Sequence, residues 1–380
     1  MKIVYIYTAI LEVGGVDRIL TQKANYLADK MGHDVYMLTD SQAGKRPSFP
    51  ISSKVHHVDL EIDFDRQYHH SLPVRAAYYF GLMYLYRRKL KAFLMKIRPD
   101  VTISTLGREM DFLTSIKDGS IKVGESHVVK QFCRNFHLME QRGFMQRNIA
   151  HYWRRKQENA VKKLDALVLL TNYDKDSWID VKEGVVIPNS IPFYPADSST
   201  LQQKRCVYVA RYVDDKGYRY LFDAWKIVHS QHPDWILECY GQGDRNAYQH
   251  VIDEMGLHDK VRLNGPTNQI ESAYMEGSIF VMPSLFEGFG LVLAEAMACG
   301  VPCVSYDCPH GPREIIRDKE DGLLVPYLDV QALAQGICSL IEDVNLRISM
   351  GQKAKMNIAR YRQETVMQQW ENLFKSLVRS

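Results

Sequence analysis

The sequence lacks the features of a secreted or nucleic-acid-binding protein. Its start, MKIVYIYTAI, has neither the charged leader nor the cleavage site of a signal peptide, and predicts a strand instead. The net charge is only +3, which gives no support to a nucleic-acid partner. We therefore expect a cytoplasmic protein that binds no nucleic acid.

The cysteine pattern lacks the spacing of disulfide frameworks and zinc sites. The seven cysteines lie mostly inside apolar runs, where they would serve as small buried side chains. Cys299, Cys303 and Cys308 are neighbours in sequence, but the chain has no CxxC pair and no histidine at zinc spacing beside them. We expect neither disulfides nor a metal site.

What the 380 residues do contain is two successive series of alternating strand and helix signals, which indicates two domains. Neither series opens with GxGxxG, so a nicotinamide-dependent oxidoreductase is disfavoured. We predict an α/β fold of two Rossmann-like, doubly wound domains, over residues 1–190 and 200–360. The apolar runs expected to form strands are 2–8, 34–40, 101–106, 121–126, 164–171 and 184–187, then 206–211, 235–241, 261–266, 278–284 and 302–307.

Two further segments complete this organisation. Residues 195–204, PADSSTLQQK, have no apolar periodicity and predict a linker. Residues 362–380 carry apolar side chains at near-helical spacing. We expect them to form a terminal helix that packs back on the first domain.

A glycine-rich turn is the strongest signal of a binding site. The segment FEGFGLVLAEAMACGVP, residues 286–302, directly follows the apolar run 278–284 and predicts a strand, a turn and a helix. Such a turn aims backbone N–H groups and the positive end of the helix dipole at one point, which suits a phosphate or sugar hydroxyls. Gly288 and Gly290 would let the backbone approach a ligand closely.

Two glutamates accompany this turn. Glu287 would lie in the turn and Glu295 about one turn into the helix, so that both carboxylates can face one cleft at different depths. The alternative is that both are solvated, as charged side chains usually are. The E-x7-E spacing resembles the signature of the retaining glycosyltransferases of family four. These have the GT-B fold, in which two Rossmann-like domains face each other across a cleft.

The resemblance extends over nearly the whole chain. Residues 209–225 resemble the family segment whose arginine and lysine, here Arg211 and Lys216, bind the donor diphosphate. Residues 307–326 resemble the segment that closes the donor pocket, and VIPNSI at 186–191 resembles the Pro-Asn turn between domains.

Elementary chemistry supports the two cations. A nucleotide diphosphate that leaves a sugar gains negative charge, which fixed cations can stabilise without a metal. Arg211 can bind phosphate oxygens in a bidentate manner, and Lys216 supplies a compact point charge. The alternative is a surface arginine and lysine at the end of a strand.

The resemblance also implies roles around the glycine-rich turn. Glu287 would contact hydroxyls of the donor sugar, and Glu295 the hydroxyls of the ribose, since a carboxylate suits a vicinal diol. The amides of Phe289, Gly290 and Leu291 would contact sugar and phosphate. The leaving phosphate oxygen would help to deprotonate the acceptor, so no protein general base is expected.

The first domain supplies two weaker candidates. Val13-Gly14-Gly15-Val16 stands where the family has a GG loop near the diphosphate and acceptor, although a simple turn explains it as well. His127 resembles the histidine that points toward the donor sugar, or is a polar loop residue. The family often has Ser-Glu-His here, whereas this chain has Glu125-Ser126-His127, which puts a role for the glutamate in doubt.

Two other patterns have competing interpretations. Asp63-Phe64-Asp65 spells the DxD of metal-dependent glycosyltransferases of the other architecture, but no suitable strand precedes it, and we interpret it as coincidence. Residues 66–98 contain no acidic residue and many basic and aromatic ones, and a second basic cluster lies at 154–163. These segments suggest a peripheral contact with anionic lipid, or ordinary solvated helices.

Residues 308–312, CPHGP, and 211–217, RYVDDKG, look like those of bacterial enzymes of polysaccharide and lipopolysaccharide assembly, many of which use UDP-galactose or UDP-N-acetylgalactosamine. The predicted function is therefore metal-independent, retaining transfer of a hexosyl group from a UDP-sugar to a glycan or lipid-linked acceptor. The rival functions are a UDP-sugar epimerase of the same fold and a non-catalytic glycosyltransferase partner.

Overall fold

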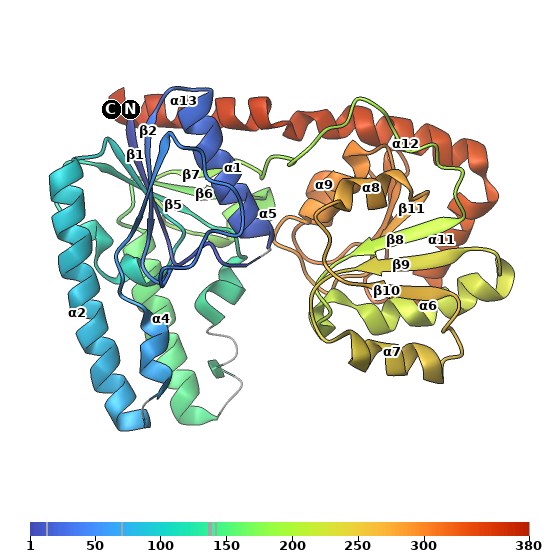
Figure 1. Ribbon diagram of the computed structural model, residues 1–380, viewed down its shortest axis with the longest axis horizontal. Helices are drawn as coiled ribbons and strands as arrows, with labels where there is room; N and C mark the ends of the chain where they lie inside the picture. Colours follow the sequence, from blue (N-terminus) through green and yellow to red (C-terminus); the bar gives the residue numbers. More distant parts are fainter. Residues whose placement is uncertain (13, 70, 136–138, 141–142, 380) are drawn as a thin grey trace. The chain divides into compact units, whose positions relative to one another are not determined.

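The computed structural model describes residues 1–12, 14–69, 71–135, 139–140 and 143–379, and the chain divides into two compact units. Unit 1 comprises Met1–Pro188 and Met367–Ser380, and unit 2 comprises Asn189–Val366. Each unit has its own parallel sheet flanked by helices (Figure 1). The predicted α/β fold of two Rossmann-like domains is confirmed.

Unit 1 has a seven-stranded sheet in the order β3-β2-β1-β4-β5-β6-β7, in which every neighbouring pair is parallel. Its strands are β1 (Lys2–Tyr7), β2 (Asp34–Thr39), β3 (Val55–Asp59), β4 (Val101–Ser104), β5 (Ile121–Glu125), β6 (Ala166–Leu169) and β7 (Gly184–Val186). Its helices are α1 (Gly15–Asp29), α2 (Leu72–Ile97), α4 (Phe144–Val161) and α5 (Asn172–Ser177), with 3-10 turns η1 (Phe64–His69), η2 (Arg108–Asp111), η3 (Leu113–Ser115) and η4 (Lys130–Asn135).

Helix α2 shows how the first core is built. Leu82, Tyr86, Leu90 and Leu94 recur at a spacing of four, so they share one helical face, and all four are buried in the same core cluster as the strands β1 and β6. The opposite face of α2 stays in solvent. No helix in the described ranges is both long enough and apolar enough to cross a membrane.

Unit 2 repeats this architecture with a six-stranded parallel sheet in the order β10-β9-β8-β11-β12-β13. Its strands are β8 (Arg205–Val209), β9 (Ile236–Tyr240), β10 (Val261–Asn264), β11 (Ile279–Met282), β12 (Cys303–Tyr306) and β13 (Gly322–Val325). Its helices are α6 (Tyr218–Gln231), α7 (Arg245–Glu254), α8 (Ile270–Met275), α9 (Leu291–Ala298), α10 (Pro312–Ile315), α11 (Val330–Glu342) and α12 (Val344–Ile358), with 3-10 turns η5 (Asp214–Lys216) and η6 (Ala359–Tyr361). Helices α8 and α9 lie on one side of this sheet and α6 and α7 on the other (Figure 1).

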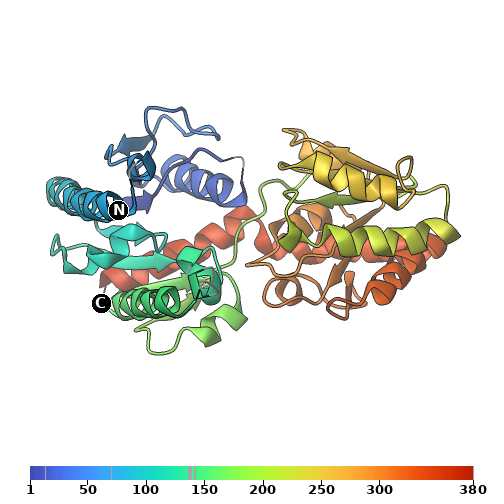
Figure 2. The same ribbon diagram turned by 90° about the horizontal axis from the view of Figure 1, so that it is seen from below.

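The last helix, α13 (Gln363–Arg379), carries the chain back to the strands of unit 1, as both views show (Figures 1 and 2). Trp370 and Phe374 are buried there, at 1% and 0% exposure. The Glu371 carboxylate lies 2.7 Å from Nε2 of His33. The predicted terminal helix thus packs on unit 1.

The segment 195–204, expected to be a linker, is packed against unit 2. Ser199 donates a hydrogen bond from its hydroxyl to the Gly277 carbonyl, 2.6 Å away, and from its backbone N–H to the Cys299 carbonyl. The Arg347 guanidinium donates to the Leu201 carbonyl, and the Leu201 side chain is buried. The segment lacks a hydrophobic period because backbone hydrogen bonds, rather than an apolar face, hold it.

Candidate functional site

The strand order of unit 2 creates a natural ligand position. The chain runs outward from β8 through β9 to β10, then returns to β11 on the other side of β8 and continues to β13. Parallel sheets bind ligands outside the carboxyl ends of their strands at such a reversal. Arg211 follows β8 and Glu287 follows β11, so the sheet brings these two predicted residues to the same edge.

Gly217 allows the loop after β8 to approach the loop after β11. Its φ is +70°, a left-handed conformation that favours glycine, and it precedes α6. A Cβ at this position would lie 2.0 Å from the Pro283 carbonyl oxygen. The backbone of Leu285 also donates to the Asp215 carbonyl. The two loops are therefore in backbone contact, which places Lys216 opposite Glu287.

Lys216 and Glu287 form an ion pair, with Nζ 2.8 Å from Oε1. The two side chains are only 16% and 15% exposed. Burial by itself lowers the pKa of Lys216, but the Glu287 carboxylate more than offsets it, and the pKa is raised above its ordinary value. Lys216 is thus a fixed, charged ammonium at the edge of the sheet.

Arg211 differs from Lys216 in being exposed. Its guanidinium has no hydrogen-bond or ion-pair partner among the residues that the structure describes. It is close enough to oppose the rise in the pKa of Lys216. Two cations thus lie near each other, and the guanidinium of Arg211 has all of its N–H donors available.

The glycine-rich turn has the predicted strand–turn–helix form. Gly290 precedes α9 with a φ of +88°. Gly311 lies very close to the backbone of Phe289. A Cβ on Gly311 would lie 2.3 Å from the Phe289 carbonyl oxygen. Gly288 is half-buried, as is Leu291, the first residue of α9. The turn is therefore held between β11 and the segment at 307–312, with the first amides of α9 at its end.

Glu295 lies deeper than Glu287. It is 4% exposed, and the hydroxyl of Tyr274, from α8, donates to its Oε2 at 2.8 Å. Burial, followed by the charge of Glu295, raises the pKa of Tyr274 well above its ordinary value, so Tyr274 remains a donor. Tyr274 fixes the carboxylate in place, and nothing in the sequence indicated this partner. The assignment of Glu295 to the ribose stays a prediction.

In unit 1, Gly14 precedes α1 with an extended backbone, at a φ of −116°. A Cβ on Gly14 would meet only ordinary contacts, so the fold itself does not require glycine there. Gly15 is the first residue of α1, and Val13, the start of the predicted GG loop, lies outside the described residues. A role for this loop stays a prediction.

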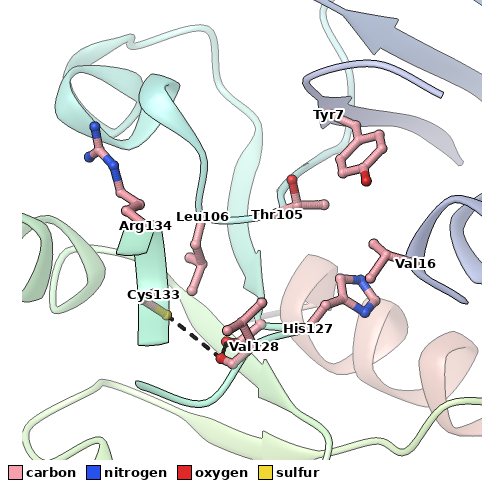
Figure 3. A pocket seen from close by; sticks show the side chains of 9 residues that line it. Tyr7, Val16, Thr105, Leu106, His127, Val128, Cys133 and Arg134 are labelled. Atoms are coloured by element: carbon pink, nitrogen blue, oxygen red, sulfur yellow. Dashed lines mark hydrogen bonds between the residues drawn. The ribbon is translucent and has the colours of Figure 1, made fainter. Parts of the chain in front are cut away.

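His127 follows β5 and lines a pocket of about 180 Å³ at the carboxyl edge of the first sheet (Figure 3). Its side chain is 5% exposed, and Nε2 lies 3.1 Å from Oε1 of Glu125. Figure 3 shows the imidazole beside Val16 of α1, with Tyr7 of β1 across the pocket. The other lining residues are Thr105, Leu106, Ser126, Val128, Cys133 and Arg134.

The sequence alone put a role for Glu125 in doubt and gave no sign of the residue that accompanies it. Glu125 is 1% exposed and accepts a short hydrogen bond from Lys23 of α1, itself 6% exposed. In the sequence, Lys23 is not distinguished from any other basic residue of an amphipathic helix. Only its position on the buried face of α1 could have signalled a partner.

The patterns interpreted as coincidental occupy separate places. Asp63 has a left-handed backbone and pairs with Arg66, and Phe64 between the two aspartates is buried in the core. The cysteines at 299, 303 and 308 are buried thiols, and burial raises the pKa of Cys299 and of Cys308 to about 12. Within the described ranges, no three His, Cys, Asp or Glu side chains are grouped as metal ligands.

Comparison with known proteins finds similar sequences that are named as transferases. Residues 203–343 match the family described as glycosyl transferases group 1. An exopolysaccharide phosphotransferase of Streptomyces coelicolor is 30% identical over the whole of this chain, which spans 41% of that protein. An uncharacterized glycosyltransferase of Haemophilus influenzae is 25% identical over 98% of this chain and 99% of its own length.

The fold is shared with solved structures at low identity. TarM of Staphylococcus aureus, solved with UDP, superposes with a TM-score of 0.77 at 16% identity, over 98% of this chain and 99% of that one. Much of unit 2 is thus similar to the group 1 glycosyl transferases, the chain as a whole is similar to a relative named a glycosyltransferase, and the two Rossmann-like units form the GT-B fold.

Proposed function

We propose that the chain is a retaining, metal-independent glycosyltransferase. It moves a hexosyl group, galactose or N-acetylgalactosamine, from a UDP-sugar to a glycan or lipid-linked acceptor in bacterial surface polysaccharide synthesis. The observation that carries the proposal is the Lys216–Glu287 ion pair beside the exposed Arg211, at the strand-order reversal of unit 2.

The two cations suit the charge that develops in this reaction. The bond between the anomeric carbon and the diphosphate oxygen breaks, and UDP leaves with the bonding electrons. Arg211 can grip phosphate oxygens with two parallel N–H bonds, and Lys216 adds a point charge that is already held in place. Because these charges are pre-organised, they stabilise the leaving group without a metal.

In this proposal, Glu287 orients the donor sugar. Its Oε1 is occupied by Lys216, and a carboxylate retains further lone pairs that accept hydrogen bonds from sugar hydroxyls. The acceptor oxygen attacks the anomeric carbon on the face from which UDP departs, and its proton passes to the departing phosphate oxygen. The configuration of the sugar is thereby retained without a protein base.

The choice of UDP is supported by the UDP bound to TarM and the choice of pathway by the exopolysaccharide named for the Streptomyces relative. The choice of galactose or N-acetylgalactosamine is supported by the resemblance of residues 211–217 and 308–312.

A lipid-linked acceptor would require the enzyme to reach a membrane, and unit 1 offers a surface for that contact. Phe80 and Tyr84 of α2 are 63% and 66% exposed, and Phe144 and Tyr152 of α4 are 72% and 64% exposed. Both helices extend past the same end of the first sheet (Figure 1). Large exposed aromatic residues beside cations are typical of proteins that lie on a bilayer surface.

The basic residues near these aromatic side chains differ in whether they are free to contact lipid or are already bonded within unit 1. Arg87, Arg88 and Lys91 are exposed on α2, whereas Lys89 donates to the Leu60 carbonyl at 2.7 Å and is committed to the fold. In the second cluster, three of the five basic residues pair with carboxylates of unit 1: Arg154 with Glu140, Lys156 with Asp111 and Lys162 with Asp180. The charge available to anionic lipid therefore lies mainly on α2.

The test is calorimetric titration of the purified chain with UDP, GDP, ADP and NAD in metal-free buffer, followed by turnover of UDP-galactose and UDP-N-acetylgalactosamine. We expect selective binding of UDP and acceptor-dependent release of UDP. Conversion of the donor without acceptor would indicate an epimerase, and UDP binding without turnover a non-catalytic partner. Binding of NAD alone would refute the proposal.

A further inference from the structure

A buried series of polar groups connects α13 to His127 inside unit 1. The Lys23 ammonium lies 4.1 Å from the centre of the Trp370 ring and donates to Oε1 of Glu125. The same oxygen lies 3.1 Å from Nε2 of His127. Each of these four side chains is at most 6% exposed. Side chains from α1 and from the segment directly after β5 thus meet at the Glu125 carboxylate, and Trp370 of α13 lies against the lysine among them.

The carboxylate of Glu125 is ionised although it is buried. Burial acts to raise its pKa, but the charge of Lys23 and the hydrogen-bonding contacts of Lys23 and His127 hold the pKa well below its ordinary value. Burial lowers the pKa of Lys23 against the pull of Glu125. The face of Trp370 favours the charged ammonium, because an aromatic ring presents negative potential to a cation.

An ionised oxygen next to Nε2 decides where the histidine carries its proton. The 3.1 Å approach of Nε2 to Oε1 favours a hydrogen on Nε2, since two acceptors would otherwise face each other. Within the described part of the chain neither ring nitrogen has an aligned hydrogen-bond partner, and with the hydrogen on Nε2 the neutral ring leaves Nδ1 as the acceptor. The ring borders the pocket at the carboxyl edge of the sheet (Figure 3).

We infer that Glu125 and Lys23 are positioning residues, which fix the orientation and tautomer of His127 and leave Nδ1 to accept a hydrogen bond from a sugar or acceptor hydroxyl. This inference rests on the proposed function for the identity of the ligand, but the state of the ring can be measured without it. Trp370 covers Lys23, so α13 completes the arrangement.

The surroundings of the ring contain few other groups that could set its state. Tyr5 is buried, and its hydroxyl has no partner among the described residues. Arg134 is paired with Asp111, and Tyr7 donates to Asp17 at 2.6 Å. The titratable and charged groups that line the pocket or contact this network are Tyr5 and Tyr7 of β1, Asp17 and Lys23 of α1, Glu125 of β5, and Cys133 and Arg134 of η4.

The experiment is nitrogen NMR of the full chain with labelled histidine, in which the His127 signals are assigned by their loss in His127→Gln. In the wild type we expect one neutral tautomer with the proton on Nε2. The double variant Lys23→Met/Glu125→Leu removes both charges without leaving one of them buried alone. It should show a mixture of the two neutral tautomers of His127.

The matched control is Lys122→Met/Asp118→Leu. Lys122 is on the same strand, is 5% exposed, and forms a buried pair with Asp118. This variant should lose comparable packing but keep the wild-type His127 signals. In transfer assays the test variant should lose about ten- to a hundredfold in kcat, with a shifted pH profile, as expected of a misplaced contact group.

If His127 keeps its wild-type tautomer in the test variant, the inference is overturned, and equal changes in the control variant would overturn it too. If the wild type shows the expected tautomer and the test variant loses it, but no UDP-sugar is turned over, the positioning of His127 stands and the proposed function fails. Transfer that persists with unchanged His127 signals in the test variant refutes the inference and leaves the proposed function intact.

Discussion

Single residues at the edge of the second sheet decide whether its charged groups meet. Gly217 has a left-handed backbone that almost touches the Pro283 carbonyl, and this contact brings Lys216 to Glu287. A larger residue at 217 would push the two loops apart. The candidate site therefore depends on a glycine as much as on the cations and carboxylates around it.

The first residue-scale prediction concerns this pair. Lys216→Ala and Glu287→Gln should each lower transfer about a hundredfold or more, because each removes a pre-organised contact to the diphosphate or the donor sugar. Circular dichroism and thermal unfolding should show an intact fold. The control is Lys204→Ala, which removes an exposed lysine that pairs with Asp234 in the same unit. Full activity in both test variants would exclude the site.

The raised pKa of Lys216 adds a prediction on pH. A lysine whose pKa is higher in the folded state contributes stability that is complete below its unfolded value of 10.5 and is lost as pH rises through the folded value. The unfolding free energy of the wild type relative to Lys216→Ala should therefore stay constant from neutral pH to pH 10. A difference that declines within that range would contradict the charged pair.

At the scale of elements, the strands that sequence reasoning missed are β3 and β13. Both are edge strands, at the outer positions of their sheets. β3 reads Val-His-His-Val-Asp, with one buried residue, and so lacks the apolar run of a central strand. β13 lies in the segment 307–326, which resembled a pocket-closing loop. Edge strands are exposed on one side, which weakens the pattern that identifies them.

Helix α2 carries the element-scale prediction. Replacing Arg87, Arg88 and Lys91 with glutamine should weaken binding to vesicles that contain anionic lipid by roughly a hundredfold, since each cation contributes about 1 kcal/mol at such a surface. Vesicle co-sedimentation measures this. Lys89 is left intact because it holds the Leu60 carbonyl.

The matched control for that surface lies in unit 2, where Lys204, Lys226 and Lys353 are also exposed. Their replacement with glutamine changes net charge by the same amount and should leave vesicle binding unchanged. Equal binding by the wild type and the α2 variant would identify the α2 cations as ordinary solvated residues.

At the scale of the whole molecule, the prediction is metal independence. Transfer should persist in excess EDTA, because Arg211 and Lys216 supply the positive charge that a divalent cation would otherwise provide. The double variant Asp63→Asn/Asp65→Asn should be as active as the wild type. Loss of transfer in EDTA with recovery in manganese would revive the DxD interpretation.

The organisation of the molecule in two units follows from hydrophobic patterning. The short apolar runs are buried on both faces as parallel strands, so their order along the chain predicted two Rossmann-like domains. The polar segment 195–204 was predicted to be a linker, but it packs against unit 2. Its contacts are hydrogen bonds, which leave no hydrophobic periodicity in the sequence.

The sequence by itself determined the two α/β domains, because the apolar runs that form them are written along the chain. The resemblance of its motifs made Arg211, Lys216, Glu287 and Glu295 the candidate site residues, and their roles stay predictions. Only the tertiary structure decided that Lys216 pairs with Glu287, that Tyr274 holds Glu295, and that Trp370, Lys23, Glu125 and His127 form one connected series of contacts. These contacts join residues far apart in sequence, and they depend on strand order, on which face of a helix is buried and on how closely two loops can approach.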